Sequence, residues 1–359
     1  MCRRIVRYFL KHNQPKEHVR GILKMRKLRD LIVSDIGVGC MGFSHGYGDI
    51  PDEAYSIEAI RKAHDFGCTF FDTAEAYGPN LLPEYRGHNE RIVGKAIRSF
   101  RKDVVLATKL HISAEEPKLH GSIDATVKRH LVGSLERLQT DYVDLYYLHR
   151  VNLAVSFEEV AEAMGRLIDE GLIRGWGMSQ VDVDTISKAH AVTPLSAIQN
   201  IYSMVERGIE AEVIPYCLAH DIGVVPFSPI ASGFLSGKVA AGTDFSHSDD
   251  VRKYVPQLTK ENIDANRPIL DLIGQYAQRK NATNAQISLA WMLHKYPNVV
   301  PIPGSKNQGR IMENLGAWNV SLTDEEFKAL DAALDAIPVH GHRGFVQYEG
   351  SKMSDWGRK

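Results

Sequence analysis

Short apolar runs alternate along this chain with longer segments in which apolar residues recur every three or four positions. The short runs have the length of buried strands, and the longer segments have the spacing of one helix face. One longer segment places Ile123, Val127, Leu131, Leu135 and Leu138 on such a face. The short runs predict eight strands, at residues 36–40, 69–73, 104–110, 143–148, 174–178, 197–201, 224–228 and 299–302.

This alternation predicts repeated βα units around a parallel sheet. Eight units within about 300 residues are typical of one single-domain α/β architecture, the (β/α)8 or TIM barrel. We expect the barrel over residues 26–337, after a basic extension over residues 1–25 and before a tail over residues 338–359. Catalytic residues of such barrels lie at the C-terminal ends of the strands, so the residues that follow each apolar run are the candidates.

Basic residues are concentrated at the start of the chain. Residues 1–29 contain ten Lys or Arg and one Glu, which leaves 33 basic and 43 acidic residues in the rest. A basic arm is typical of contact with nucleic acid or a membrane surface, and an Arg-rich, acid-poor start is typical of a transit peptide. The first 24 residues contain no Ser or Thr and no apolar core of a secretory signal, which argues against targeting. We therefore expect Met25 to be the biological start, and we expect no nucleic-acid partner.

The composition is that of an ordinary globular protein, with 44% hydrophobic and 24% charged residues. No apolar run approaches the roughly 18 residues that a membrane-spanning helix needs, so we expect no membrane contact. The four cysteines, Cys2, Cys40, Cys68 and Cys217, lie far apart and form no CxxC pair. This spacing excludes the usual zinc and disulfide patterns and favours a reducing, cytoplasmic location. The helix faces do not indicate an oligomeric state.

Two short motifs have simpler explanations than the ones they first suggest. The segment GVGCMG matches the dinucleotide-binding pattern GxGxxG at Gly37, Gly39 and Gly42. A true fingerprint opens a helix directly, whereas here the next helical pattern starts only near Asp52, so we expect a tight loop at the barrel mouth. The segment HGH at residues 340–342 offers two imidazoles without a third ligand, and we expect no metal site.

Polar residues stand where the second, third and fourth predicted strands end. Asp72 and Tyr77 lie in FFDTAEAYG, Lys109 ends the third strand and His149 ends the fourth. A tyrosine hydroxyl has a pKa of about 10, and a neighbouring ammonium pulls that value toward neutrality. Tyr77 can then donate a proton near pH 7, while Asp72 keeps Lys109 charged and His149 orients a carbonyl oxygen. Each of these residues alone is also typical of the solvated rim of a barrel.

These segments resemble the aldo-keto reductase family, and the resemblance covers about residues 26–337. FFDTAEAYG is similar to the family's signature around its catalytic Asp and Tyr, ATKL to the segment with its Lys, and DLYYLHR to the segment with its His. The resemblance implies that Tyr77 is the general acid, that Lys109 and Asp72 tune it, and that His149 orients the substrate. The implied activity is the reduction of an aldehyde or ketone to an alcohol, with NADPH as the cofactor.

The resemblance extends to the segments that hold the cofactor. Ser179 and Gln199 are implied to bind the nicotinamide carboxamide, Phe227 to stack on the ring, and Gln180 to lie beside them. The implied contacts to the pyrophosphate and the adenosine are Ser228, Pro229, Ile230, Gly233, Leu235, Lys238, Gly304, Ser305, Lys306, Arg310, Glu313 and Asn314. Relatives mostly have Tyr in place of Phe227, and Asn or Glu in place of Gln180.

Arg310 is the residue that bears on the choice of cofactor. The resemblance implies that its guanidinium forks onto the adenosine 2'-phosphate, with Lys306 as an added charge, which favours NADPH (NADP+) over NADH. The alternative is that Arg310 forms only an exposed ion pair with Glu313.

Two other functions fit parts of the pattern. A lysine at a barrel strand end is also where Schiff-base aldolases carry their nucleophile, so Lys109 is a candidate for a covalent imine. A third hypothesis is a cofactor-binding regulatory subunit like those that accompany some channels. The cofactor segments argue against the aldolase, and the complete catalytic set argues against the regulator. The substrate itself depends on loops at the barrel mouth, which include Phe43, His45, Tyr47, Leu110 and the tail.

Overall fold

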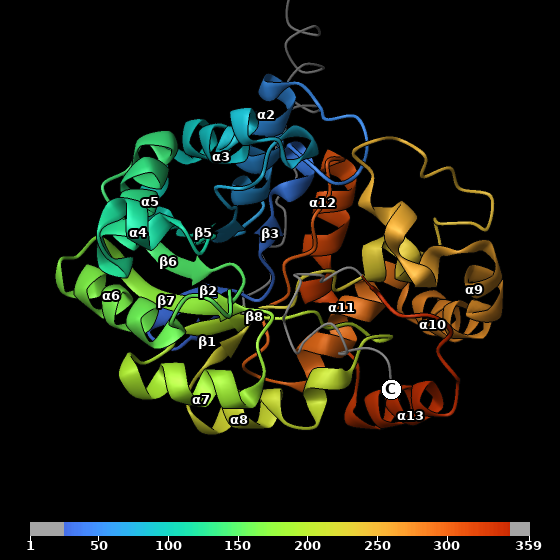
Figure 1. Cartoon of the computed structure of the whole chain (residues 1–359). Coiled ribbons are helices and arrows are strands. Elements are labelled where there is room, and N and C mark those ends of the chain that lie inside the picture. Colours follow the sequence, from blue (N-terminus) through green and yellow to red (C-terminus); the bar gives the residue numbers. More distant parts are fainter. Residues whose placement is uncertain (1–24, 345–359) are drawn as a thin grey trace, which may run out of the picture.

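The structure is a computed structural model and describes residues 25–344. Helices surround a curled parallel sheet in a single domain (Figure 1). Nearly all of the expected extension, residues 1–24, and the end of the expected tail, residues 345–359, lie outside the described residues.

Seven strands form the sheet in the order of the sequence, each parallel to the next. They are β3 (Val38–Gly39), β4 (Phe70–Asp72), β5 (Val105–Leu110), β6 (Val143–Leu148), β7 (Ile173–Ser179), β8 (Ala197–Gln199) and β9 (Gly223–Val224). Each overlaps one of the predicted strands, although β3, β4 and β8 are shorter than expected and β9 shares only Val224 with the predicted strand at 224–228. The TIM barrel that the alternation predicted is therefore confirmed.

The eighth predicted strand, residues 299–302, is not a regular strand, and the prediction is wrong in that detail. This segment still closes the barrel, because Val299 bridges to Val224 and Gly304 bridges to Gly39. Between these bridges Pro301 O accepts a hydrogen bond from Gly37 N at 2.9 Å. Two prolines, at positions 301 and 303, have no N–H to donate, which prevents a continuous ladder.

Helices cover the outside of the sheet (Figure 1). They are α2 (Glu53–Asp65), α3 (His88–Ile97), α4 (Glu116–His120), α5 (Ile123–Leu138), α6 (Phe157–Asp169), α7 (Val183–Val192), α8 (Val213–Ala219), α9 (Lys260–Ala265), α10 (Arg267–Lys280), α11 (Asn284–Lys295), α12 (Gln308–Leu315) and α13 (Asp324–Asp335). The helix predicted from the apolar face at 123–138 is α5. It begins after Ser122, whose hydroxyl accepts from Ala125 N at 3.0 Å, and it buries Val127, Leu131 and Leu138 against the sheet.

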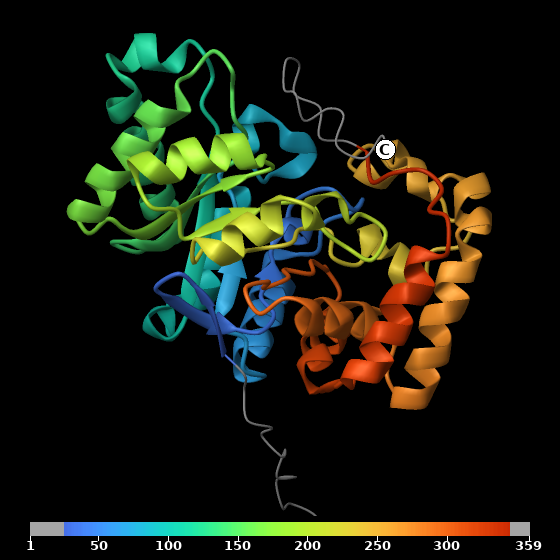
Figure 2. The same ribbon diagram turned by 90° about the horizontal axis from the view of Figure 1, so that it is seen from below.

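A β-hairpin that the sequence pattern did not predict closes the N-terminal end of the barrel. Its strands are β1 (Met25–Leu28) and β2 (Leu31–Ser34), paired antiparallel. The buried Leu28 packs inside the barrel with Phe70, Val105 and Leu145 from three of the strands. Figure 2 shows the hairpin, in dark blue, at one end of the barrel strands. Met25, which we had assigned to the extension, is thus the first residue of β1.

Within residues 25–344, none of the helices has the length and apolar character to cross a membrane. In the same range, no group of three or more His, Cys, Asp or Glu side chains is arranged to hold a metal ion.

Candidate active site

Four polar side chains from consecutive strand ends meet at the C-terminal mouth of the barrel. Asp72 ends β4, Lys109 lies near the end of β5, His149 follows β6 directly, and Tyr77 lies in the loop after β4. Lys109 and Asp72 form an ion pair that is almost completely buried. The Lys109 ammonium also donates to Thr73 O at 2.7 Å and to the Tyr77 hydroxyl at 3.4 Å. The lysine therefore connects the carboxylate to the phenol.

The loop that carries Tyr77 is fixed by its own backbone. Tyr77 N donates to Ala74 O at 3.2 Å, and Tyr77 O accepts from Asn89 N at 3.1 Å, at the start of α3. The next residue is Gly78, where a Cβ would lie 2.3 Å from Tyr85 O. Only glycine fits that approach, so the turn after Tyr77 holds the phenol in one position.

His149 also lies beside the Tyr77 phenol. Its ring meets the Tyr77 ring edge-on, with 5.7 Å between ring centroids and 80° between ring planes. Burial lowers the pKa of His149 well below its usual value, and the charges of Arg150 and Lys109 lower it further. The imidazole is therefore neutral at physiological pH, with one N–H that can donate to an oxygen placed beside Tyr77.

The charges in this cluster differ in part from the sequence argument. Burial opposes the charge on Lys109, but the charges of Asp72 and Tyr77 outweigh it and raise the pKa of Lys109. Burial also raises the pKa of Tyr77, and the nearby ammonium of Lys109 only reduces this rise. The expectation that Lys109 brings the pKa of Tyr77 toward neutrality is thus not met. Tyr77 is instead held protonated, which keeps a proton available for donation.

A cavity of about 400 Å³ opens above these residues. Asp72, Tyr77 and His149 line it. Of the expected cofactor residues, Ser179, Gln199, Phe227, Ser228 and Gly304 line it too. The Ser179 hydroxyl donates to Gln199 O at 2.8 Å, and the Gln199 amide donates to Asp72 at 2.8 Å. Phe227 is half-buried, so its ring is available as one wall of the cavity.

A groove of about 340 Å³ continues from this cavity and shares Tyr47, Ser228 and Gly304 with it. The other expected cofactor residues on its walls are Pro229, Ile230, Gly233, Lys238, Ser305, Lys306, Arg310, Glu313 and Asn314. Most of the residues that the resemblance implied for the cofactor are therefore brought together along one continuous path.

A sharply turned loop forms one wall of this groove. Residues 228 and 231–233 have positive φ values, from 49° to 96°, which turns the chain sharply around the groove wall. The Ser232 hydroxyl on this wall is buried and has no hydrogen-bond partner among the described residues. A buried hydroxyl without a partner is costly, so a bound acceptor would stabilise it. Ser232 was not predicted from the sequence, because its role depends on this loop conformation.

Charged side chains near the end of the groove separate the two interpretations of Arg310. Glu313 pairs with Lys238 at 2.9 Å, not with Arg310. The exposed Arg310 guanidinium forms no ion pair within the described part of the chain, and its backbone N–H is held by Asn307 at 3.0 Å. Lys306 donates to Tyr47 O at 2.9 Å and is therefore already engaged with the backbone.

Two expected cofactor residues line neither the cavity nor the groove. Leu235 is fully buried in the core between sheet and helices. Gln180 is also buried, and its side-chain oxygen accepts from Ile201 N at 3.2 Å. Both side chains support the loops that form the groove, and neither is part of the groove surface.

Two arginines on the cavity wall were not assigned from the sequence. Arg150 donates to the Ser179 hydroxyl at 2.8 Å, and its guanidinium lies 5.8 Å from the centroid of the Phe227 ring. Arg150 follows His149 directly, so its position after a predicted strand could have identified it as a site residue from the sequence. Arg343 comes from the tail, where no periodic pattern indicated a structure.

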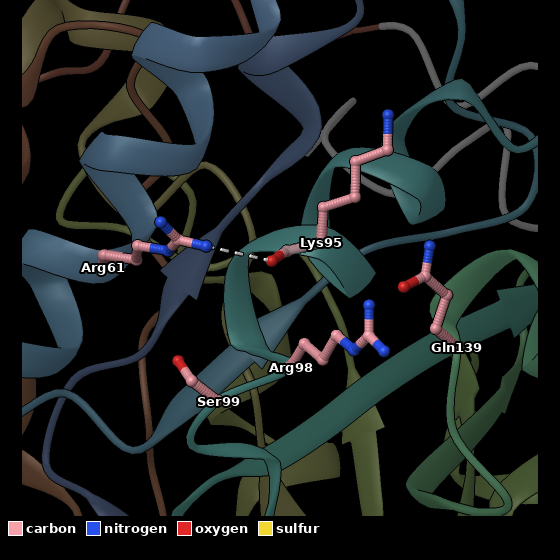
Figure 3. A pocket seen from close by; sticks show the side chains of 5 residues that line it. All are labelled: Arg61, Lys95, Arg98, Ser99 and Gln139. Atoms are coloured by element: carbon pink, nitrogen blue, oxygen red, sulfur yellow. Dashed lines mark hydrogen bonds between the residues drawn. The ribbon is translucent and has the colours of Figure 1, made fainter.

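A further pocket is formed by residues of α2 and α3 and of the segments that follow α3 and α5 (Figure 3). It is lined by Arg61, Lys95, Arg98, Ser99 and Gln139. Arg61 donates to the backbone oxygen of Lys95 at 3.3 Å. All three basic side chains are exposed, and the pocket has no residue that could act as an acid or base near neutral pH.

Comparison with known proteins identifies this arrangement. The profile of the Aldo/keto reductase family matches residues 35–335. The chain belongs to the aldo-keto reductase family. A probable aldo-keto reductase 1 from Glycine max is 36% identical over 328 residues, which span 90% of this chain and 91% of that protein.

Solved structures of aldo-keto reductases share the fold. One from Klebsiella pneumoniae, in complex with NADP and acetate, superposes with a TM-score of 0.67 at 29% identity, covering 90% of this chain and 99% of its own. The glycerol dehydrogenase from Gluconobacter oxydans superposes with a TM-score of 0.76 at 25% identity, covering 91% and 98%. The chain is thus an oxidoreductase with the aldo-keto reductase barrel.

Proposed function

We propose that this aldo-keto reductase uses NADPH to reduce an aldehyde or ketone to an alcohol, with Tyr77 as the general acid. The observation that carries the proposal is the buried Lys109 ammonium, which binds Asp72 on one side and reaches the Tyr77 hydroxyl on the other. These groups face a cavity that continues into a groove of phosphate-binding character. The complex of a Klebsiella pneumoniae relative with NADPH, at 28% identity, supports the same cofactor.

The residues of the cavity and groove fit a nicotinamide dinucleotide. Ser179 and Gln199 offer a hydroxyl and an amide for the carboxamide, and the Phe227 ring offers a flat apolar face. The positive-φ turn with the unpartnered Ser232 hydroxyl suits the pyrophosphate, and Arg310 suits the 2'-phosphate. NADPH, when bound, supplies the hydride for the reduction.

The chain's own residues supply the proton. A carbonyl oxygen between the Tyr77 hydroxyl and the neutral His149 imidazole receives two hydrogen bonds, which stabilise the negative charge that develops on it. Tyr77 transfers its proton to that oxygen, and the Lys109 ammonium stabilises the phenolate that remains. Asp72 holds Lys109 charged and in place during this transfer.

The state of Lys109 also argues against the Schiff-base alternative. An amine must lose its proton before it attacks a carbonyl carbon. The raised pKa of Lys109 and its ion pair with Asp72 keep it protonated. The regulatory alternative is disfavoured because the cluster has every group that proton transfer needs.

The test is an assay of purified protein with NADPH and a broad panel of aldehydes and ketones, followed at 340 nm. We expect turnover with at least part of the panel. Tight binding of NADPH without turnover of any compound would favour the regulatory function instead. Borohydride trapping of substrate on Lys109 would favour the aldolase. A cytoplasmic location remains a prediction of the sequence.

A further inference from the structure

The C-terminal segment, residues 338–344, runs across the mouth of the barrel and is bound to it at several points. His340 N donates to the Asn266 side chain and Asn266 donates back to His340 O, both at 2.8 Å. Gln257 N donates to His342 O at 3.2 Å. The segment therefore has a defined path over the helices that precede α10.

This path places Arg343 inside the catalytic cavity. Its backbone N–H donates to the Glu206 carboxylate, which is itself held by the Gln257 amide at 3.2 Å. Gly344 follows with a φ of 60°, and a Cβ there would lie 2.6 Å from Pro256. The chain turns closely at Gly344, and the Arg343 side chain lines the same cavity as Tyr77 and His149.

The Arg343 guanidinium is buried but only partly bound. Its side chain is almost completely enclosed, because the residue is only 8% exposed. Nε donates to the Ser228 hydroxyl at 3.2 Å, whereas Nη1 is buried without a hydrogen-bond partner among the described residues. Glu206 accepts from the Arg343 backbone N–H and its charge also acts on the guanidinium, but no carboxylate in the described chain forms an ion pair with it. A buried cation with a free donor is costly unless an anion occupies the position beside it.

Charged side chains of both signs lie on the cavity wall. Among the described residues that line it, Asp72 is the only carboxylate, and its charge is balanced by Lys109. Arg150 and Arg343 are the two arginines on the wall. The buried Arg343 guanidinium thus places a positive charge on the wall of the space above Tyr77, which favours anionic compounds over neutral ones there.

We propose that Arg343 binds the carboxylate of the substrate, so that this enzyme prefers carbonyl compounds that carry a carboxylate. This inference rests on the proposed carbonyl reduction and adds the substrate class to it. An arginine binds a carboxylate through two parallel N–H donors, which fixes the orientation as well as the charge of the ligand.

The experiment compares pairs of substrates in which one member carries a carboxylate and the other carries a neutral group in its place. The pairs are 4-carboxybenzaldehyde against its methyl ester, and 4-oxobutanoate against butanal. We expect wild type to show a higher kcat/KM for the charged member of each pair. In Arg343→Met this ratio should fall by about tenfold or more, the loss expected for one charge-assisted hydrogen bond. Arg343→Lys should retain part of the preference, because it keeps the charge but not the fork.

A binding measurement gives a second readout without turnover. Calorimetric titration with 4-(hydroxymethyl)benzoate, the alcohol product, should show binding to wild type that weakens at least tenfold in Arg343→Met. His340→Ala is the matched control: its exposed side chain belongs to the same segment, and its hydrogen bonds with Asn266 use only the backbone. If Arg343→Met does not fold, Arg343→Lys and the product titration decide the question.

Three outcomes would overturn the assignment. One is an equal loss for charged and neutral substrates in Arg343→Met. Another is a weaker affinity for NADPH with an unchanged substrate ratio, which would mean that Arg343 binds the cofactor pyrophosphate. The third is a wild type without preference for the carboxylate. A wild type that reduces no carbonyl compound, yet binds the carboxylate product through Arg343, would instead contradict the proposed function and leave the anion site standing.

Discussion

The Gln199 side chain donates to the Asp72 carboxylate at 2.8 Å. This hydrogen bond joins a residue expected to hold the nicotinamide to the carboxylate that anchors Lys109. The two oxygens of Asp72 are thus divided, one bound by the ammonium and the other by the amide. The charge on the catalytic pair therefore depends on a residue of the cofactor site.

Replacing Gln199 with Met should change the pH dependence of the reaction as well as its rate. Burial already raises the pKa of Asp72, and the Gln199 hydrogen bond is one of the groups that oppose this rise. Without it the pKa rises further, so Asp72 becomes protonated at a higher pH as the solution is acidified. We expect the acid limb of the kcat–pH profile to shift to higher pH. An unchanged profile with a raised KM for cofactor would show that Gln199 acts on binding alone.

Tyr77→Phe should abolish most carbonyl reduction, because it removes the transferred proton while leaving the nicotinamide contacts in place. General acid catalysis contributes about 10² to 10⁴ in rate, and we expect a loss of that size in kcat. Fluorescence titration with NADPH should show a Kd close to that of wild type. A mutant that keeps more than half of the wild-type kcat would exclude Tyr77 as the acid.

Arg310→Met should remove the preference for NADPH. Charge-assisted hydrogen bonds contribute about 1.5 to 3 kcal/mol, which corresponds to a loss of roughly tenfold to 150-fold in affinity. NADH, which lacks the 2'-phosphate, should bind almost as before. The matched control is the exposed Arg267→Met at the start of α10, which lines neither the cavity nor the groove. Equal losses for both cofactors would place Arg310 outside the phosphate site.

Truncation separates the basic arm from the hairpin that follows it. Removing residues 1–24 leaves β1 and β2 whole, and we expect the melting temperature and activity to stay at wild-type values. Removing residues 1–34 takes away Leu28, Leu31 and Val33 from the closed end of the barrel. Since burying each such side chain contributes about 1.5 to 3 kcal/mol, we expect this variant to melt far lower or to aggregate. If removing residues 1–24 alone also lowered the melting temperature or caused aggregation, the arm would contribute to the fold.

The sequence predicted those parts of the molecule whose signal is local or repeated. Parallel strands bring their carboxyl ends to one side, so residues far apart in the chain, such as Asp72 and His149, could be assigned to one site. The hairpin was missed because four-residue strands are too short for a clear period and overlap the basic arm. The eighth strand was overestimated because the apolar run was given more weight than Pro301 and Pro303, which can be read from the sequence and interrupt the ladder.

The position of Arg343 in the tail could not be predicted from the sequence. Arg343 lies in a segment without periodicity, and its position depends on hydrogen bonds to Glu206 and Gln257, which are distant in sequence. Its burial could be known only from the folded chain. In the same way, the raised pKa of Tyr77 depends on how completely the phenol is enclosed, and residue types alone do not give that.

The C-terminal segment also bears on how such an enzyme can diverge. Tyr77, Lys109 and His149 belong to strands and loops whose replacement would disturb the whole barrel, whereas Arg343 belongs to a short segment that follows α13. Insertions or substitutions there change one wall of the cavity and leave the reacting groups untouched. A gene copy can therefore acquire a new substrate through changes in the codons of this segment, while the chemistry is inherited intact.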